Sequence, residues 1–343
     1  MTRGELQSVA GELTRRGLEV TTDAPFGALT TYGVGGTAAV MVGITNAADA
    51  RGVGETMSGH RTTPVCVFGN GSNTLVADSG FDGVVVRTRP GTAPGDMLVT
   101  VQNGSVTVPA WMPLPVLARR SVAAGACGLE WAVGVPGTVG GAVRMNAGGH
   151  GAEVVDSLVS VRVVSLRTGA EAVFDAGQIG LHFRGSALGP THCVVEATFR
   201  VAPPAGHRCD DELAGIVAWR RQNQPGGRNA GSVFVNPAPG NGSSGALIDS
   251  CGLRGTAVGG ASVSDKHANF IQASPGATAA DIVALMTLVQ STVHERTGTT
   301  LRSEVGLVGF DDAVVGRFAE NSHASSAVTG ARDAIARELG ELP

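Results

Sequence analysis

The sequence predicts an α+β protein of more than one domain, and three observations lead to this prediction. Over residues 1–90, short apolar runs alternate with helical patterns, as they do in a small α/β unit. Over residues 91–203, the pattern is mainly β around one helical segment. Residues 278–297 carry the strongest amphipathic helix, with one stripe formed by Ile282, Leu285, Met286, Val289 and Val293.

The first part of the chain alternates helices and strands. Apolar residues at helical spacing predict helices over residues 3–16, 45–57 and 113–124, and Asn46 can cap the second. An apolar strand follows a Gly-rich turn within residues 29–43. Further strands are expected at residues 65–68, 84–88, 97–108, 158–166, 171–174 and 192–201. The turn at residues 167–170 makes a hairpin of the strands on either side of it.

Pro203 and Pro204 give the clearest linker signal, so a domain boundary is expected there. Beyond it the pattern predicts helices at residues 210–222, 246–251 and 278–297, and strands at 259–262, 269–272 and 304–308. Residues 222–245 form a loop region rich in Gly, Asn and Pro. The tail from residue 311 has a helical pattern at 331–339, and it either packs outside the core or stays mobile.

Composition excludes several classes of function. The chain is 43% hydrophobic and 16% charged with a net charge of −4, and it has no run of Lys or Arg. It therefore lacks a polyanion-binding surface, and its single Tyr and three Trp offer few stacking platforms for nucleic acid. Apolar runs are too short to span a bilayer, and the first residues lack an apolar signal core. We expect a cytoplasmic protein that binds neither membranes nor nucleic acid.

The five cysteines are widely separated, and no Cys-x-x-Cys or Cys/His metal spacing occurs among them. Buried free thiols in a reducing cytosol are the expected state of all five, and no metal site is expected. These cysteines are Cys66, Cys127, Cys193, Cys209 and Cys251.

A Gly-rich stretch over residues 128–153 dominates the middle of the chain. Eight of its 26 residues are Gly, and the positions between them are small or apolar with little charge. A bare backbone in an apolar setting indicates close approach of another molecule, and a flat, phosphate-bearing cofactor fits that description. A set of tight turns or a Gly-rich barrel corner would produce the same pattern.

The segment Gly69-Asn70-Gly71-Ser72-Asn73 directly follows an apolar strand, so its donors can cradle a diphosphate. It is not the dinucleotide fingerprint, because no helix with the third Gly follows, and it lacks the Lys of a P-loop. By itself it is a weak signal, and an ordinary β-turn is the favoured interpretation.

Three polar side chains stand in small or apolar surroundings. Ser232 lies in a Gly-flanked apolar loop and could donate a proton or merely cap a turn. Arg184 could bind a carboxylate through two hydrogen bonds or lie on the surface. Glu304 opens an apolar strand, either as a site acid or as a strand-end surface carboxylate. For His267, which has no second ligand near it, a hydrogen-bonded structural role is expected.

Taken in order, several longer segments resemble one family. They are Tyr32-Gly-Val-Gly-Gly, Gly69-Asn-Gly-Ser-Asn, Gly134-Val-Pro-Gly-Thr-Val-Gly-Gly-Ala-Val-Arg-Met-Asn-Ala-Gly, Ala230-Gly-Ser-Val-Phe, Ala246-Leu-Ile-Asp, Ser264-Asp-Lys-His-Ala-Asn-Phe and Glu304-Val. Over about residues 25 to 310 the chain resembles the UDP-N-acetylenolpyruvoylglucosamine reductases (MurB, or UDP-N-acetylmuramate dehydrogenases). It is similar to the shorter form, which lacks an inserted Tyr loop.

The resemblance implies a FAD-binding fold of the vanillyl-alcohol oxidase (PCMH) type in two α/β subdomains, plus a C-terminal α+β substrate domain. The implied division is 1–90 and 91–203 for the FAD-binding subdomains, 204–310 for the substrate domain and 311–343 for a C-terminal extension. FAD and NADPH are the implied cofactors, a nucleotide sugar is the implied substrate, and a monomer is expected.

The resemblance also implies roles for individual residues. The family's substrate-carboxylate Arg matches Arg184, its proton-donating Ser matches Ser232, and its catalytic Glu matches Glu304. Asn236 matches a further substrate-binding residue. The implied cofactor contacts are Gly69, Asn70, Gly71, Ser72, Asn73, Gly134, Gly137, Thr138, Gly140, Gly141, Ala142 and Asn146.

The implied reaction is the reduction of UDP-N-acetylglucosamine enolpyruvate in peptidoglycan precursor synthesis. Two departures concern the substrate: Phe183 stands where the family usually has Tyr, and Val235 stands where a basic residue is common. They keep open a paralogue that reduces a different enolpyruvyl ether. The sequence is also compatible with a flavin-binding protein without catalysis and with an oxidase of the same fold.

Overall fold

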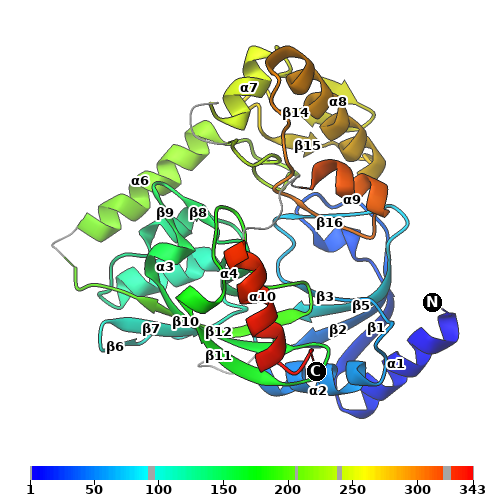
Figure 1. The fold of residues 1–343 in the computed structure, drawn as a ribbon. Helices are drawn as coiled ribbons and strands as arrows, with labels where there is room; N and C mark the ends of the chain where they lie inside the picture. Colours follow the sequence, from blue (N-terminus) through cyan, green and yellow to red (C-terminus); the bar gives the residue numbers. More distant parts are fainter. Residues whose placement is uncertain (1, 92–96, 205–207, 238–241, 320–325, 343) are drawn as a thin grey trace.

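The computed structural model describes residues 2–91, 97–204, 208–237, 242–319 and 326–342 (Figure 1). Within these residues the chain forms two larger sheets near its N-terminal half and a smaller helix-covered sheet beyond them. No helix of the described residues is long and apolar enough to cross a membrane.

The first sheet has the strand order β1-β2-β5-β3, in which β1 is antiparallel to β2 and the others run parallel. Two helices pack on it, and their apolar faces, which include Leu13 and Met57, join the strand residues in one core. Asn46 caps the second helix by accepting from Asp49 N at 2.9 Å, as expected. The elements are α1 (Arg3–Arg15), β1 (Glu19–Ala24), η1 (Gly27–Leu29), β2 (Ala38–Ile44), α2 (Ala47–Ser58), β3 (Val65–Phe68), β4 (Thr74–Val76) and β5 (Phe81–Thr88).

The second sheet is antiparallel with the order β11-β10-β12-β7-β6, and β10 and β11 form the expected hairpin. The Gly-rich stretch folds over it as short helices and turns. The elements are β6 (Val101–Gln102), β7 (Ser105–Pro109), α3 (Leu114–Ala123), η2 (Glu130–Gly134), α4 (Val139–Arg144), β8 (Gly148–Gly149), β9 (Ala152–Glu153), α5 (Val154–Ser157), β10 (Leu158–Ser165), β11 (Glu171–Asp175), η3 (Ala176–Gln178) and β12 (His192–Arg200).

Most of the remaining elements build the upper part of Figure 1, where α7 and α8 lie with a three-stranded sheet, whereas α10 lies lower, in front of the second sheet. Helix α8 buries all five residues of its predicted stripe, and Gly298 ends it in the left-handed conformation at φ 71°. The elements are α6 (Arg208–Asn223), α7 (Ser244–Ser250), β13 (Ala257–Val258), β14 (Ala261–Val263), β15 (Ile271–Ala273), α8 (Ala279–Thr297), β16 (Gly306–Val308), α9 (Asp312–Phe318) and α10 (Ser326–Glu338).

One short pairing positions the site. Strand β16 runs parallel to β4, so the end of the upper part returns to the first sheet. As a result Asn73 Nδ2 donates to the carbonyl oxygen of Glu304 at 2.9 Å, and Gly306 N donates to Asn73 O at 3.0 Å. The strand begins at Gly306, so Glu304 precedes it instead of opening it as the sequence pattern indicated.

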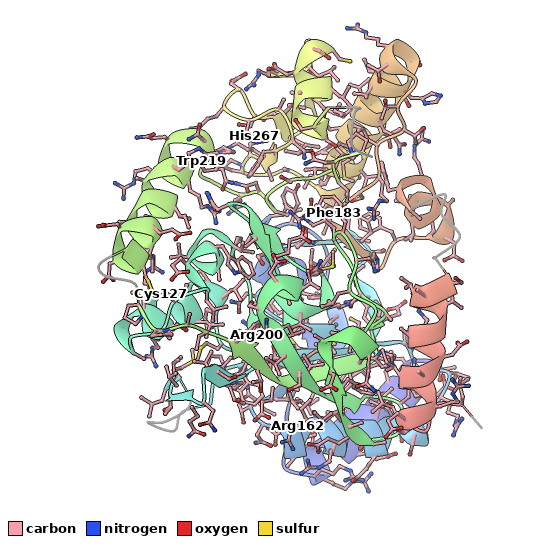
Figure 2. All side chains as sticks on the ribbon, turned by 60° about the vertical axis from the view of Figure 1, so that its left-hand side comes forward. Cys127, Arg162, Phe183, Arg200, Trp219 and His267 are labelled. Atoms are coloured by element: carbon pink, nitrogen blue, oxygen red, sulfur yellow. A yellow bond between two sulfur atoms is a disulfide. The ribbon has the colours of Figure 1, made fainter. Side chains whose placement is uncertain are left out.

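The cysteine prediction was wrong for two of the five residues. Cys127 and Cys209 form a disulfide with a Cα–Cα distance of 5.9 Å, which ties the first turn of α6 to the segment before η2 (Figure 2). Cys66, Cys193 and Cys251 are free. The pairing brings together residues 82 positions apart through the packing of α6 on η2, and local spacing carries no signal for such a contact.

The tail packs against the second sheet. Helix α10 begins at Ser326, earlier than the predicted helix, and crosses the front of the molecule in Figure 1. Ile335 and Leu339 are fully buried in the same core as the strands β10 and β12. The sequence analysis expected this segment either to pack outside the core or to be mobile. The described part does neither, because it contributes side chains to the core.

Candidate active site

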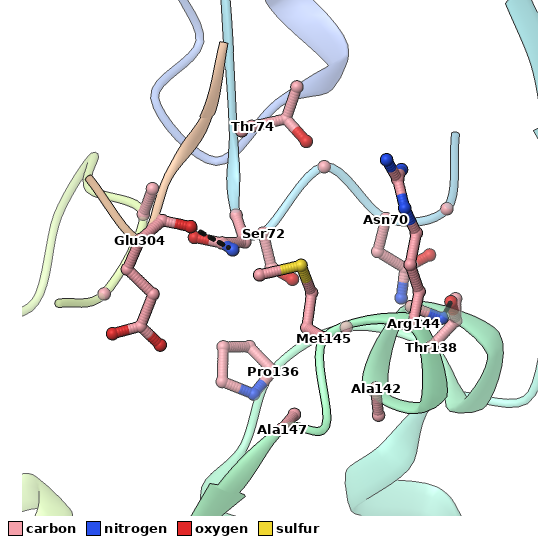
Figure 3. A pocket seen from close by; sticks show the side chains of 18 of the residues that line it. Asn70, Ser72, Thr74, Pro136, Thr138, Ala142, Arg144, Met145, Ala147 and Glu304 are labelled. Carbon is pink, nitrogen blue, oxygen red and sulfur yellow. Dashed lines mark hydrogen bonds between the residues drawn. The ribbon is translucent and has the colours of Figure 1, made fainter. Parts of the chain in front are cut away.

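A cavity of about 990 Å³ lies where the two sheets and the upper part of the molecule meet. Such a volume is at the upper end for small-molecule sites, so it suits a long ligand. Its walls come from the 69–73 loop, the Gly-rich stretch and the segments around Ser232 and Glu304 (Figure 3). Every cofactor and substrate residue implied by the sequence lines this cavity except Asn146.

The 69–73 loop packs directly on the Gly-rich stretch, and two glycines make that contact possible. A Cβ on Gly69 would lie 2.7 Å from Thr138 Oγ1, and one on Gly137 would lie 2.8 Å from Ser72 Oγ. Gly71 has φ 63°, and a Cβ there would strike the Phe68 ring at 2.7 Å. These glycines therefore hold two backbone segments together at the cavity wall, in addition to leaving the wall bare.

Arg184 lies between two carboxylates. Its Nε is 3.0 Å from Glu304 Oε1 and its Nη1 is 2.7 Å from Glu153 Oε1, while Nη2 donates to Gly148 O at 3.4 Å. The Arg184 and Glu304 side chains are only 19% and 21% exposed. Arg184 has φ 57°, an uncommon conformation for a residue other than glycine and one that accompanies functional sites.

Burial raises the pKa of Glu304 above its ordinary value, although Arg184 and Arg302 oppose this shift. The neighbouring Glu153 carboxylate raises it further. A glutamate with a raised pKa can hold a proton, and next to Arg184 it can respond to a second negative group in the cavity.

Asn146 supports this cluster from behind. Its Nδ2 donates to Glu153 Oε2 at 2.9 Å and to His182 O at 3.1 Å, and its Oδ1 accepts from Val155 N at 3.0 Å. The residue is 1% exposed and does not line the cavity. Its amide therefore orients Glu153, the partner of Arg184, and the contact with a cofactor stays a prediction.

Ser232 is held close to Glu304 by the backbone on its C-terminal side. Val233 O accepts from Glu304 N at 2.8 Å, and Val233 N donates to Asn269 O at 2.8 Å. The Asn269 side chain closes the same turn, because its Oδ1 accepts from Phe234 N at 3.0 Å and its Nδ2 donates to Phe234 O at 2.8 Å. Ser232 thus lines the cavity from a loop whose backbone is fixed on its C-terminal side.

Two other predicted residues lie at the edges of this arrangement. Asn236 lines the cavity, and its Oδ1 accepts from Ser244 N at 3.0 Å. His267 has the expected structural role, since its Nδ1 accepts from Asn269 N at 3.2 Å.

Within the part of the chain that the structure describes, one group of residues has the spacing of metal ligands: Cys127, Glu130 and Cys209. The two sulfurs of this group form the disulfide.

Arg144 is a cavity residue that the sequence reasoning missed. It ends α4, and Figure 3 shows its side chain beside Asn70. Burial lowers its pKa, and its one electrostatic neighbour is the thiol of Cys66. Among the described residues its guanidinium has no ion pair. A desolvated cation without an anionic partner indicates an anionic ligand. The signal was present, because Arg144 is the single Lys or Arg within residues 128–153.

The site therefore fits a long ligand of defined polarity. The 69–73 loop and Arg144 offer donors and positive charge for phosphate groups. Arg184, Ser232 and Glu304 lie together at another part of the wall, where acid–base chemistry and binding of a carboxylate are possible.

Two family models match the chain. Residues 222–308 match the C-terminal domain of UDP-N-acetylenolpyruvoylglucosamine reductase, and residues 38–173 match an FAD binding domain.

Curated relatives and a solved structure agree with these matches. The chain is 42% identical over 251 residues to the UDP-N-acetylenolpyruvoylglucosamine reductase of Gloeobacter violaceus, covering 72% of this chain and 82% of the relative. It is 42% identical over 260 residues to that of Synechococcus sp. strain WH7803, covering 73% and 81%. The crystal structure of the reductase (MurB) from Thermus caldophilus superposes with a TM-score of 0.70 at 32% identity, covering 85% of this chain and 98% of that one.

Proposed function

Since the chain belongs to the UDP-N-acetylenolpyruvoylglucosamine reductase family and is an FAD-dependent oxidoreductase, we propose that it reduces UDP-N-acetylglucosamine enolpyruvate to UDP-N-acetylmuramate. NADPH would be the reductant, and the product would serve peptidoglycan precursor synthesis. The observation that supports this most is the meeting of Arg184, Ser232 and Glu304 on one cavity wall.

The residues of the cavity fit FAD. The 69–73 loop with Thr138 and Arg144 would hold the diphosphate, because they combine a bare backbone with a desolvated cation. Gly134, Gly137, Gly140, Gly141 and Ala142 also line the cavity, and their lack of bulky side chains would leave room for a flat ring. When bound, FAD supplies the hydride chemistry, which passes electrons from NADPH to the enolpyruvyl double bond.

Arg184 would bind the carboxylate of the enolpyruvyl group. Reduction at the β-carbon of this group places negative charge on the α-carbon and on its carboxylate. A guanidinium can spread this charge over two hydrogen bonds in a fixed plane. Because Glu153 and Glu304 already hold Arg184, its position is set before the substrate arrives.

Glu304 would act next to Arg184 as a protonated or hydrogen-bonded acid. A neutral Glu304 leaves one face of Arg184 free for the substrate carboxylate, whereas an ionised Glu304 competes for it. The raised pKa of Glu304 favours the neutral form, and burial is its main cause.

Ser232 would give the proton that completes the reaction at the α-carbon. A hydroxyl is a weak acid, so the step depends on accurate placement. The clamp of Asn269 on both sides of Phe234 and the bond from Glu304 N to Val233 O provide such placement.

A second class of substrate is suggested by the residues expected to contact the nucleotide sugar. Phe183 lines the cavity, is 45% exposed and lies with its ring centroid 4.8 Å from the Arg184 guanidinium, but it lacks the hydroxyl usual in the family. Val235 is 3% exposed and packed away from the cavity, so it supplies no charge there. A paralogue that reduces another enolpyruvyl ether would have these features, and Asn236 would then contact a different group.

Anaerobic stopped-flow experiments test the proposal. The purified yellow protein is reduced with NADPH and then mixed with UDP-N-acetylglucosamine enolpyruvate, while flavin absorbance is followed. We expect rapid return of the oxidised flavin spectrum. Reduction without reoxidation by this substrate would support the paralogue, and rapid reoxidation by oxygen alone would support an oxidase. Absence of flavin from the purified and FAD-supplemented protein would overturn the proposal.

A further inference from the structure

One of the last residues of the described chain, Glu341, contacts His192, which lines the cavity. Glu341 Oε1 accepts from Ser165 Oγ at 2.6 Å, and Glu341 Oε2 lies 3.2 Å from His192 Nε2. Thr168 Oγ1 donates to Leu339 O at 2.7 Å. The His192 side chain is 5% exposed and the Glu341 side chain 17% exposed, so this contact is shielded from water. A partly buried carboxylate that accepts two hydrogen bonds is a strong local constraint.

The hydrogen bonds also fix the form of His192. Its Nδ1 accepts from Gly189 N at 2.9 Å, so this nitrogen carries no proton. Nε2 then carries the hydrogen and donates it to Glu341. The Gly189 amide on one side and Glu341 on the other therefore fix the orientation of the imidazole within the turn at residues 189–192.

This turn joins the two sheets at the cavity. Pro190 O accepts from Val67 N of strand β3 at 3.0 Å, and Pro190, Thr191 and His192 all line the cavity. Arg167, two residues after Ser165, makes a second link between the two sheets, because its Nη1 donates to Thr63 O, just before β3, at 2.8 Å. The contacts Val67–Pro190 and Thr63–Arg167 form a seam between the sheet of β3 and the sheet of β12. The C-terminal segment supports this seam through the contact of Glu341 with His192.

The seam adjoins the side of the cavity that Arg144 lines, away from Glu304. Figure 3 shows Glu304 on one side, Asn70 and Arg144 on the other, and Ser72 and Met145 between them. Cys66 of β3 is the electrostatic neighbour of Arg144, and the next residue, Val67, makes the hydrogen bond to Pro190. If FAD binds with its flavin ring near Glu304 and its diphosphate at the 69–73 loop, its adenosine would lie beside Pro190 and His192, which also line the cavity.

We propose that Glu341 is a positioning residue that closes the adenosine end of the FAD site, through His192 and Ser165. The C-terminal segment then retains the cofactor, although it touches none of the reacting groups. This inference rests on the FAD assignment made above. It predicts that loss of Glu341 weakens contacts to the adenosine half of FAD and spares the flavin half.

Binding to the apoprotein tests this. FAD, FMN and ADP are titrated into wild type, Glu341→Gln, Glu341→Ala and the control Glu338→Gln, with flavin fluorescence or calorimetry as the readout and FAD release followed by dilution. Glu338 is on the exposed side of α10. We expect Glu341→Ala to raise the Kd of FAD and ADP about tenfold and to speed FAD release by a similar factor, with the Kd of FMN unchanged. Glu341→Gln should have a smaller effect in the same direction, and Glu338→Gln none.

Unchanged FAD and ADP binding in folded Glu341 variants would overturn the inference while leaving the FAD assignment intact. Equal weakening of FAD, ADP and FMN would also overturn it, because that pattern indicates general damage to the fold. Thermal unfolding of the apoproteins distinguishes such damage from a local effect on FAD binding. Glu341→Gln, which keeps the shape of the side chain, remains informative if Glu341→Ala does not fold. Wild type that binds none of the three ligands would overturn the FAD assignment itself.

Discussion

Arg184 Nε lies 3.0 Å from Glu304 Oε1, and the two residues come from distant parts of the chain that meet at the cavity. Glu153 lies on the other side of the same guanidinium, at 2.7 Å from Nη1. One cation therefore lies between two carboxyl groups before any ligand binds. A third carboxylate, from a substrate, can share Arg184 fully only if Glu304 is neutral, so the protonation of Glu304 and substrate binding should be linked.

The first prediction concerns the stability of the fold as a function of pH. Burial raises the pKa of Glu304, so the neutral form stabilises the folded protein relative to the ionised one. This contribution is fully present below the ordinary glutamate pKa of about 4.3 and is lost as pH rises through the raised value. Wild-type apoprotein should lose thermal stability over this window relative to Glu304→Gln.

Melting temperatures of the two proteins, measured from the ordinary glutamate pKa up to neutrality, check this. Glu338→Gln, which alters an exposed carboxylate on α10, is the control and should follow wild type. Parallel curves for wild type and Glu304→Gln would contradict the raised pKa.

The second prediction concerns Ser232. Replacing it by Ala removes the proposed proton donor without disturbing the Asn269 clamp, which uses backbone atoms of Val233 and Phe234. General-acid groups contribute about 10²–10⁴ to a rate, so we expect a loss of that size in the flavin reoxidation step. Reduction by NADPH should stay at the wild-type rate, because that half-reaction needs no proton from Ser232.

Single-turnover stopped-flow traces separate these two steps. Ser232→Cys, which restores an acidic hydrogen at the same place, is expected to recover part of the lost rate. If Ser232→Ala reoxidised as fast as wild type, the proton would have to come from elsewhere, and a binding protein without proton transfer would become the better interpretation.

Much of the fold could be read from the sequence, because its signals are local or lie in long ordered motifs. The stripe of α8 and the cap at Asn46 follow from periodicity and from hydrogen bonding within a few residues. The FAD-binding fold and the C-terminal domain implied by the motifs are confirmed by the matches over 38–173 and 222–308. These are the features that depend least on distant packing.

The rest depends on contacts between distant parts of the chain. The Cys127–Cys209 disulfide, the docking of Leu339 and the role of Asn146 behind Glu153 arise from tertiary packing that no local pattern encodes. Glycines also serve two purposes at once. In the sequence, Gly69 and Gly137 indicate a backbone that a ligand approaches closely. In the structure each also allows the 69–73 loop to contact the Gly-rich stretch. The sequence alone does not distinguish these two reasons for a glycine.

The third prediction concerns Arg144. Because its guanidinium is desolvated and lies beside Asn70 in the cavity wall, Arg144→Gln should raise the Kd of FAD by about 10–100-fold. The Kd of riboflavin, which has no phosphate, should not change. The variant should also show a weaker dependence of FAD binding on salt, since one screened charge is gone.

Fluorescence titration of the apoprotein at two or more salt concentrations measures both effects. Arg119→Gln, an exposed arginine on α3, is the matched control. Equal loss of riboflavin and FAD binding would place the effect of Arg144 in the packing around Cys66 instead of in contact with phosphate.

The last prediction concerns the disulfide. Cys127 and Cys209 close a loop of 82 residues, and a cross-link of this kind stabilises a fold by about 2–4 kcal/mol, so reduction should lower the denaturation midpoint. The double variant Cys127→Ser with Cys209→Ser should have the midpoint of reduced wild type and should not respond to reductant. Thiol titration of the unfolded protein should find three reactive thiols before reduction and five after it. Five thiols without reductant would show that the cysteines stay apart, as the sequence alone indicated, and the contact of α6 with η2 would then rest on packing by residues such as Ile216.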